Sequence, residues 1–239
     1  MREVWIILHR WSGLFMVLFL TIAAITGCLL VFRGPIDRVL NPELLTLPAI
    51  TTATGPDRAL AAVEAYARAY PQVQVVQFPL NLPPGRTLPV AVVARPGGPA
   101  PAADQVFLDP RDGSVVGGRA GGPGWDSRHL VAGISELHFN LLAGDWGRWL
   151  LGVVAVVWLL SSCVGAWLTW PTRQPRWTQW KRIWQVRRSS ALPRMLLDIH
   201  RASGLWLFPF LLVLAFTSAA LNFFGEVWEP FATTVAPLE

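Results

Sequence analysis

The stretch HRWSGL at residues 9–14 opens an apolar run that continues to Phe32. Nearly the same letters return as HRASGL at residues 200–205, again followed by an apolar run. Overlaid without a gap, the two copies stay matched beyond the motif, at Phe19/Phe210, Leu20/Leu211, Ala24/Ala215, Thr26/Thr217, Leu30/Leu221, Phe32/Phe223 and Gly34/Gly225. Apolar matches are common between membrane helices, whereas matched polar and small residues are not. The chain therefore contains an internal repeat of two helices, each opening on a histidine.

The composition is that of a membrane protein. Of 239 residues, 53% are hydrophobic, only 15% are charged, and 13 are tryptophan. A bilayer span needs about 20 mainly apolar residues. Three segments meet this requirement, roughly Trp11–Phe32, Trp149–Trp170 and Leu205–Phe224. We expect an α-helical membrane protein with three transmembrane helices plus a small exported α+β domain.

Basic residues are concentrated between Pro171 and Arg201, where the one acid is Asp198. They are Arg173, Arg176, Lys181, Arg182, Arg187, Arg188, Arg194 and Arg201. By the positive-inside rule this loop and the amino terminus are cytoplasmic, and the long segment after the first span is exported. Basic charge beside membrane helices needs no nucleic-acid partner, so we expect none. The tryptophans at 177, 180 and 184 predict a helix lying on the inner membrane surface.

These features divide the chain into six parts. They are an N-terminal segment with the first transmembrane helix (1–33), the exported α+β domain (34–145), the second transmembrane helix (146–171), a basic cytoplasmic loop with an interfacial helix (172–201), the third transmembrane helix (202–225) and an exported tail (226–239). Within the exported domain we predict one amphipathic helix, two strands followed by a two-stranded hairpin, and two loops. The helix is Gly55–Ala69, the strands are Val73–Phe78, Leu88–Ala94 and a hairpin over Val106–Val116, and the loops are Arg95–Ala103 and Gly117–Gly124.

Three features together carry a family resemblance. They are the HR-x-SGL helix, an exported helix-plus-sheet module with a DPRDG hairpin at 109–113, and the entry to the second span with Leu137, His138, Gly144 and Gly147. The chain resembles the PepSY-associated transmembrane family of bacterial inner-membrane proteins, often called iron-regulated membrane proteins. The resemblance implies b-type haem and, in some members, reduction of ferric siderophores. Fuller members have a fourth span, so we expect a short or truncated member.

The repeat makes His9 and His200 the leading candidate ligands. The first and third helices run in the same direction, so both histidines lie at one depth on the cytoplasmic side. A parallel repeat implies a pseudo-two-fold axis along the membrane normal, and residues near that axis face each other. Two facing imidazoles predict axial ligation of a haem b iron with no open position, which favours electron transfer. Interfacial histidines bonded only to water or lipid are the alternative.

Other residues could join this site. Arg10 and Arg201 would pair with haem propionates, or they only follow the positive-inside rule. His138 lies before the second span and, in the family reading, would ligate a second haem near the outer face, so we expect one or two haems. His129 is the other histidine on the outer side and a weaker candidate for ligating the second haem. The chain has two cysteines and no Cys-x-x-Cys-His motif, which excludes covalent haem attachment.

We therefore expect a multi-pass protein of the bacterial inner membrane that transfers electrons across the bilayer to a ferric siderophore. No catalytic residue is assigned, and whether the chain is an enzyme, a ferric-siderophore reductase, is left open. No Gly-x-Gly-x-x-Gly fingerprint is present, so a separate donor, quinol or a reductase, is required. The alternative is a cofactor-free, membrane-tethered PepSY module that binds or regulates a peptidase or another envelope partner. A homodimer that completes the helix bundle is a further alternative.

Overall fold

The computed structural model describes residues 1–187 and 191–235. Arg188 of the basic loop and residues 236–239 of the predicted tail lie outside the described residues. The chain divides into two compact units, a helical unit of Met1–Ile25 with Leu137–Glu239 and an α+β unit of Thr26–Glu136. Each unit is described by itself below.

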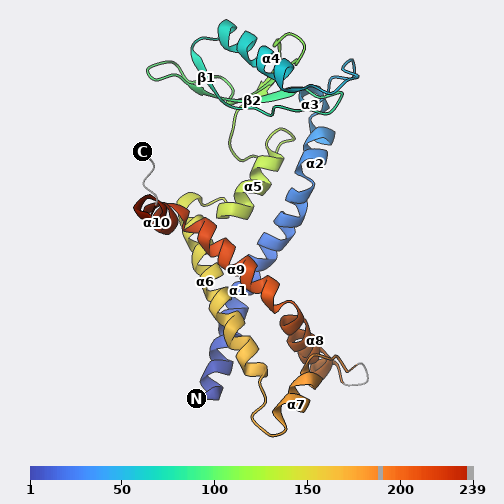
Figure 1. Cartoon of the computed structure of the whole chain (residues 1–239), viewed down its shortest axis with the longest axis vertical. Helices are drawn as coiled ribbons and strands as arrows, with labels where there is room; N and C mark the ends of the chain where they lie inside the picture. Colours follow the sequence, from blue (N-terminus) through green and yellow to red (C-terminus); the bar gives the residue numbers. More distant parts are fainter. Residues whose placement is uncertain (188–190, 236–239) are drawn as a thin grey trace. The chain divides into compact units, whose positions relative to one another are not determined.

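The helical unit contains the predicted spans. Within the described part of the chain, two helices are long and apolar enough to cross a membrane, α1 (Arg2–Val31) and α6 (Gly144–Thr169). A third span is present if α8 (Leu192–Trp206) and α9 (Phe208–Asn222) are taken together. These two helices meet at 71°, so the second copy of the repeat is broken where the first is continuous (Figure 1).

The break has a local cause in the sequence. Pro209 occupies the position that Leu18 holds in the first copy. Proline has no backbone N–H, and its ring clashes with the carbonyl four residues earlier, so it cannot continue a helix without a kink. It is tolerated in the first turn of a new helix, which is where α9 places it. The sequence predicts one uninterrupted span over 202–225, and the structure divides that segment between α8 and α9.

The helices of this unit approach one another closely. α6 packs along α9 (Figure 1), and a Cβ added at Gly152 would lie 2.5 Å from the Phe223 ring. Arg2 donates hydrogen bonds to the carbonyls of Leu168 and Trp170, at 2.7 and 3.0 Å, and so joins the start of α1 to the end of α6. Small residues and satisfied carbonyls of this kind are typical of helix contacts in membranes.

The segment after α6 is rich in tryptophan. Helix α7 (Arg176–Ile183) coincides with the predicted interfacial helix. Tryptophan rings form successive contacts, with centroids 5.0–5.6 Å apart, through Trp170, Trp177, Trp180, Trp184 and Trp206. The remaining elements are α5 (Leu130–Asn140), the π-helical turn η1 (Phe224–Trp228) and α10 (Glu229–Val235).

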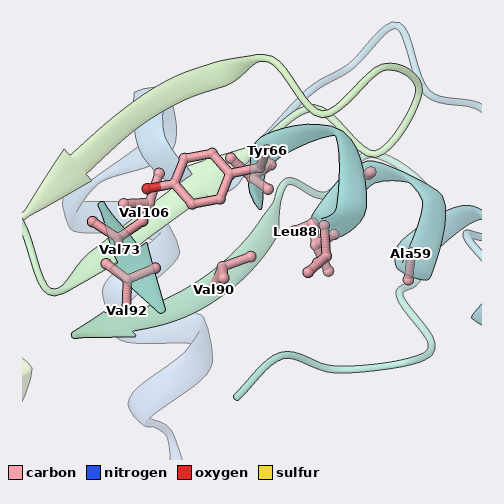
Figure 2. Packing of buried hydrophobic residues seen from close by; sticks show 10 residues of the cluster. Ala59, Tyr66, Val73, Leu88, Val90, Val92 and Val106 are labelled. Carbon is pink, nitrogen blue, oxygen red and sulfur yellow. The ribbon is translucent and has the colours of Figure 1, made fainter. Parts of the chain in front are cut away.

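The α+β unit is a four-stranded antiparallel sheet packed against a helix. The strands, in sheet order, are β1 (Val73–Gln77), β2 (Leu88–Ala94), β3 (Gln105–Leu108) and β4 (Val115–Arg119). Helix α4 (Pro56–Ala69) places Ala59 and Tyr66 against Leu88, Val90 and Val92 of the sheet (Figure 2). The predicted helix and the first two strands are therefore present within one residue of their expected bounds.

Two parts of this unit differ from the sequence-based expectation. The predicted loop over 117–124 is wrong at its start, because Gly117 and Gly118 lie in β4 and pair with Phe107 and Val106. Glycine is poor in strands but fits here, since a Cβ at Gly117 would lie 2.5 Å from the Leu44 side chain. Two short helices, α2 (Arg33–Leu40) and α3 (Pro42–Leu45), precede α4 and were not predicted from the sequence.

Candidate functional site

The structure brings the two repeated histidines together. The rings of His9 on α1 and His200 on α8 have centroids 6.1 Å apart and planes inclined by 52°. His9 is half-buried, whereas His200 is exposed. Two imidazoles from opposite ends of the chain thus face the same space.

The His9 ring is held on one side by α6. Its Nδ1 lies 2.8 Å from the hydroxyl of Ser161, which is 7% exposed. The Ser161 hydroxyl in turn lies 3.1 Å from that of Ser12. A Cβ added at Gly165 would lie 2.8 Å from Cε1 of His9, so the ring lies directly against the α6 backbone.

The two histidines line a cavity of about 1100 Å³ within the helical unit. Helices α1, α6, α8 and α9 contribute its walls, and most of the lining side chains are apolar. Gly13 and Gly204, the glycines of the two motifs, also line it, and a Cβ at either would meet no atom within 4 Å. An apolar cavity with a few convergent polar groups is the usual form of a cofactor site.

Three arginines border this cavity, and their surroundings differ. The guanidinium of Arg2 donates hydrogen bonds to carbonyls at the end of α6. Arg10 is exposed, and its guanidinium carbon lies 5.7 Å from the centroid of the Trp11 ring. Arg201 is half-buried and makes no hydrogen bond or ion pair with the residues that the structure describes. The cation at Arg201 is therefore available to an anionic group entering the cavity.

The outer histidines lie elsewhere. His138 is on α5, where its ring contacts that of Phe139 at 5.1 Å, and it does not line the cavity. His129 immediately precedes α5; its Nδ1 lies 2.7 Å from Asp126 and its Nε2 lies 3.1 Å from the carbonyl of Ala120. The bond to His129 lowers the pKa of the Asp126 carboxyl. Both ring nitrogens of His129 thus face oxygen atoms of the protein, and a metal would have to displace one of these contacts.

The sequence-based prediction did not find Ser161 or Gly165. Both lie on α6, outside the repeat from which the candidates were chosen. A signal was available, because SSCVG at 161–165 places small and polar residues inside an otherwise apolar span. Such residues mark close helix contacts and buried polar bonds in membrane proteins. Among the described residues, no cluster of three or more His, Cys, Asp or Glu side chains could hold a metal ion.

Comparison with known proteins places nearly the whole chain in one family. The model of the PepSY-associated TM region matches residues 6–238. A search of curated proteins gives no match.

Proposed function

Because the chain belongs to the PepSY-associated TM region family and is a membrane protein, we propose that it binds a b-type haem between His9 and His200 and transfers electrons across the membrane. The observation that carries this proposal is the pairing of the two imidazoles in one apolar cavity. Neither the family match nor the fold alone specifies a cofactor, since function resides in the site.

The spacing of the rings fits two axial ligands of one iron. A metal–imidazole nitrogen bond is about 2.0 Å long, so two such bonds, with the radius of each ring added, separate the centroids by roughly 6 Å. The measured separation is 6.1 Å. The cavity, at about 1100 Å³, is slightly larger than the range of roughly 300–1,000 Å³ that is typical of cofactor sites, so its volume suits a large cofactor.

Haem bound here would supply reversible one-electron chemistry between ferric and ferrous iron. The chain's own residues would do the rest. His9 and His200 would hold the iron through two imidazole nitrogens, and two such ligands would favour electron transfer over oxygen chemistry. The apolar walls from α1, α6, α8 and α9 exclude water and lower the local dielectric, which is one of the protein's means of setting a reduction potential.

Arg201 fits the role of a propionate partner better than Arg10. It is half-buried at the cavity and has no hydrogen-bonding partner among the described residues. A guanidinium pairs with a carboxylate through two parallel hydrogen bonds, which adds geometric specificity. Arg10 is exposed on Trp11 and would make a weaker contact.

The paired histidines support one haem. A second haem would use His138 together with a ligand other than His129, whose two nitrogens are already bonded. We retain His138 as the residue to test for it.

The proposed orientation in the membrane is based on the distribution of charge. Basic residues flank the inner ends of the helices, so the positive-inside rule favours a bacterial inner-membrane protein with a cytoplasmic amino terminus and a periplasmic α+β unit. Electrons from quinol or a reductase would then pass outward, and one electron would reduce each ferric ion of an exported siderophore to ferrous iron.

The test is the absorption spectrum of the full chain, purified in detergent after expression with ample haem. We expect a Soret band and sharp α and β bands on dithionite reduction, which are lost in His9→Ala and in His200→Ala. His129→Ala is the matched control and should keep the spectrum, and His138→Ala reports a second haem as a halved haem content. A colourless, folded protein would overturn the proposal and favour a cofactor-free module that binds an envelope partner.

A further inference from the structure

We infer that Ser161 is a positioning residue that, with Ser12, fixes the His9 ring in the tautomer whose Nε2 lone pair is free for iron. This inference rests on the proposed function, since it concerns how one ligand is prepared. It follows from two hydrogen bonds between α1 and α6, one hydrogen bond within α1, and the number of protons that these groups can share.

The protons can be assigned one at a time. The Ser12 hydroxyl lies 3.1 Å from the carbonyl oxygen of His9, and a carbonyl only accepts, so Ser12 donates there. A hydroxyl has a single proton. In the 3.1 Å contact between Ser12 and Ser161, Ser161 must therefore be the donor.

The donor in the contact between Ser161 and the His9 ring is assigned in the same way. Because the Ser161 proton is given to Ser12, the Ser161 oxygen can only accept in its 2.8 Å contact with His9. Nδ1 of His9 must then carry the proton and donate it. One arrangement satisfies all three hydrogen bonds, and it leaves Nε2 without a proton.

Gly165 supports the same orientation. It lies one helical turn after Ser161 on α6, and a Cβ there would lie 2.8 Å from Cε1 and 3.3 Å from Nε2 of His9. The ring is thus held at its Nδ1 edge by the hydroxyl and along its side by backbone. A ligand histidine whose second nitrogen donates a hydrogen bond is more basic and better oriented than one without such a partner.

His200 has no equivalent support. Its neighbour Ser203 donates to backbone carbonyls of Ile199 and His200 on the same helix, at 2.7 and 3.4 Å. In the described part of the chain, no hydrogen bond reaches the His200 ring itself. The two axial ligands are therefore inequivalent, with His9 fixed and His200 free to reorient.

The experiment compares Ser161→Ala with Ser162→Ala in the haem-loaded full chain. Ser162 is the matched control, because it also lines the cavity from α6, while the hydrogen bond to the His9 ring among the described residues comes from Ser161. Two readouts are the midpoint potential, by spectroscopic titration, and the rate of haem transfer to excess apomyoglobin. Ser161→Ala should weaken haem retention by about 10–100-fold, the usual loss when a ligand's hydrogen-bond partner is removed. It should also raise the potential, because a less basic imidazole stabilises ferric iron less. Ser161→Thr, which keeps the hydroxyl, should restore both values.

The outcomes separate this inference from the proposed function. A colourless wild-type protein overturns both. The inference alone is overturned if the wild-type protein binds haem and Ser161→Ala has the same midpoint potential and the same rate of haem transfer as Ser162→Ala. If Ser161→Ala does not fold, Ser12→Ala replaces it. Without the Ser12 acceptor, the Ser161 hydroxyl is no longer oriented and polarised, so it accepts the Nδ1 proton of His9 less strongly. The potential should therefore rise again, and an unchanged potential contradicts the inference.

Discussion

The two copies of the HR-x-SGL motif have nearly the same sequence and different surroundings. In the first copy α1 is one continuous helix, His9 is bonded to α6, and Arg10 faces outward. In the second copy the helix breaks after Trp206, His200 is exposed, and Arg201 lies half-buried at the cavity. The repeat supplies two imidazoles, and the contact with α6 and the break at Pro209 make their surroundings different.

The largest expected effect comes from introducing a proline into the first copy at Leu18, the position that matches Pro209 in the second copy. In Leu18→Pro, the helix interior loses a hydrogen bond and gains a clash, at a cost of about 3 kcal/mol or more. We expect a much lower thermal midpoint in detergent and no retained haem. Leu18→Ala is the control, because Leu18 is 61% exposed and its truncation opens no internal cavity. Haem retention in Leu18→Pro equal to that in Leu18→Ala would show that α1 need not be continuous.

The next prediction concerns the two arginines. Arg201→Gln removes a charged partner for a haem carboxylate, and such bonds contribute about 1.5–3 kcal/mol. We expect roughly 10–150-fold faster haem transfer to apomyoglobin. Arg10→Gln should change that rate by less than about threefold, because an exposed charge contributes little. Equal effects of the two substitutions would contradict the assignment of the propionate partner to Arg201.

A glycine substitution tests the packing of His9. In Gly165→Ala the added methyl would lie 2.8 Å from the His9 ring and force it to move, and overpacking of this kind costs about 1–3 kcal/mol. We expect weaker haem retention and a broadened reduced α band. Ser162→Ala is the control, because it changes another cavity-lining residue of α6 without adding atoms. If the two variants behave alike, the close contact between His9 and α6 would be wrong.

The smallest effect should come from the serine of the second copy. The Ser203 hydroxyl is exposed and bonds only to carbonyls of its own helix among the described residues. Ser203→Ala should therefore change stability by no more than about 0.5 kcal/mol and leave the midpoint potential unchanged. A potential shift as large as that of Ser12→Ala would show that the two copies are equivalent after all.

Much of the fold could be predicted because the signals were local. Apolar runs of span length predicted α6 and the part of α1 from Trp11 onward, and strand-like segments predicted β1 and β2 within one residue. Pro209 is a local signal for the bend, but the length and apolar composition of the segment predict one uninterrupted span. The contact of Ser161 with His9 joins residues 152 positions apart, and no local pattern specifies which faces of two helices meet.

The central claim is that one iron binds both His9 and His200. The direct measurement is electron nuclear double resonance of the ferric protein labelled with ¹⁵N-histidine. The account predicts couplings from two histidine nitrogens in the wild type and from one at most in His200→Ala. A wild-type haem protein that shows a single coupled histidine nitrogen, or the same two in His200→Ala, would contradict it.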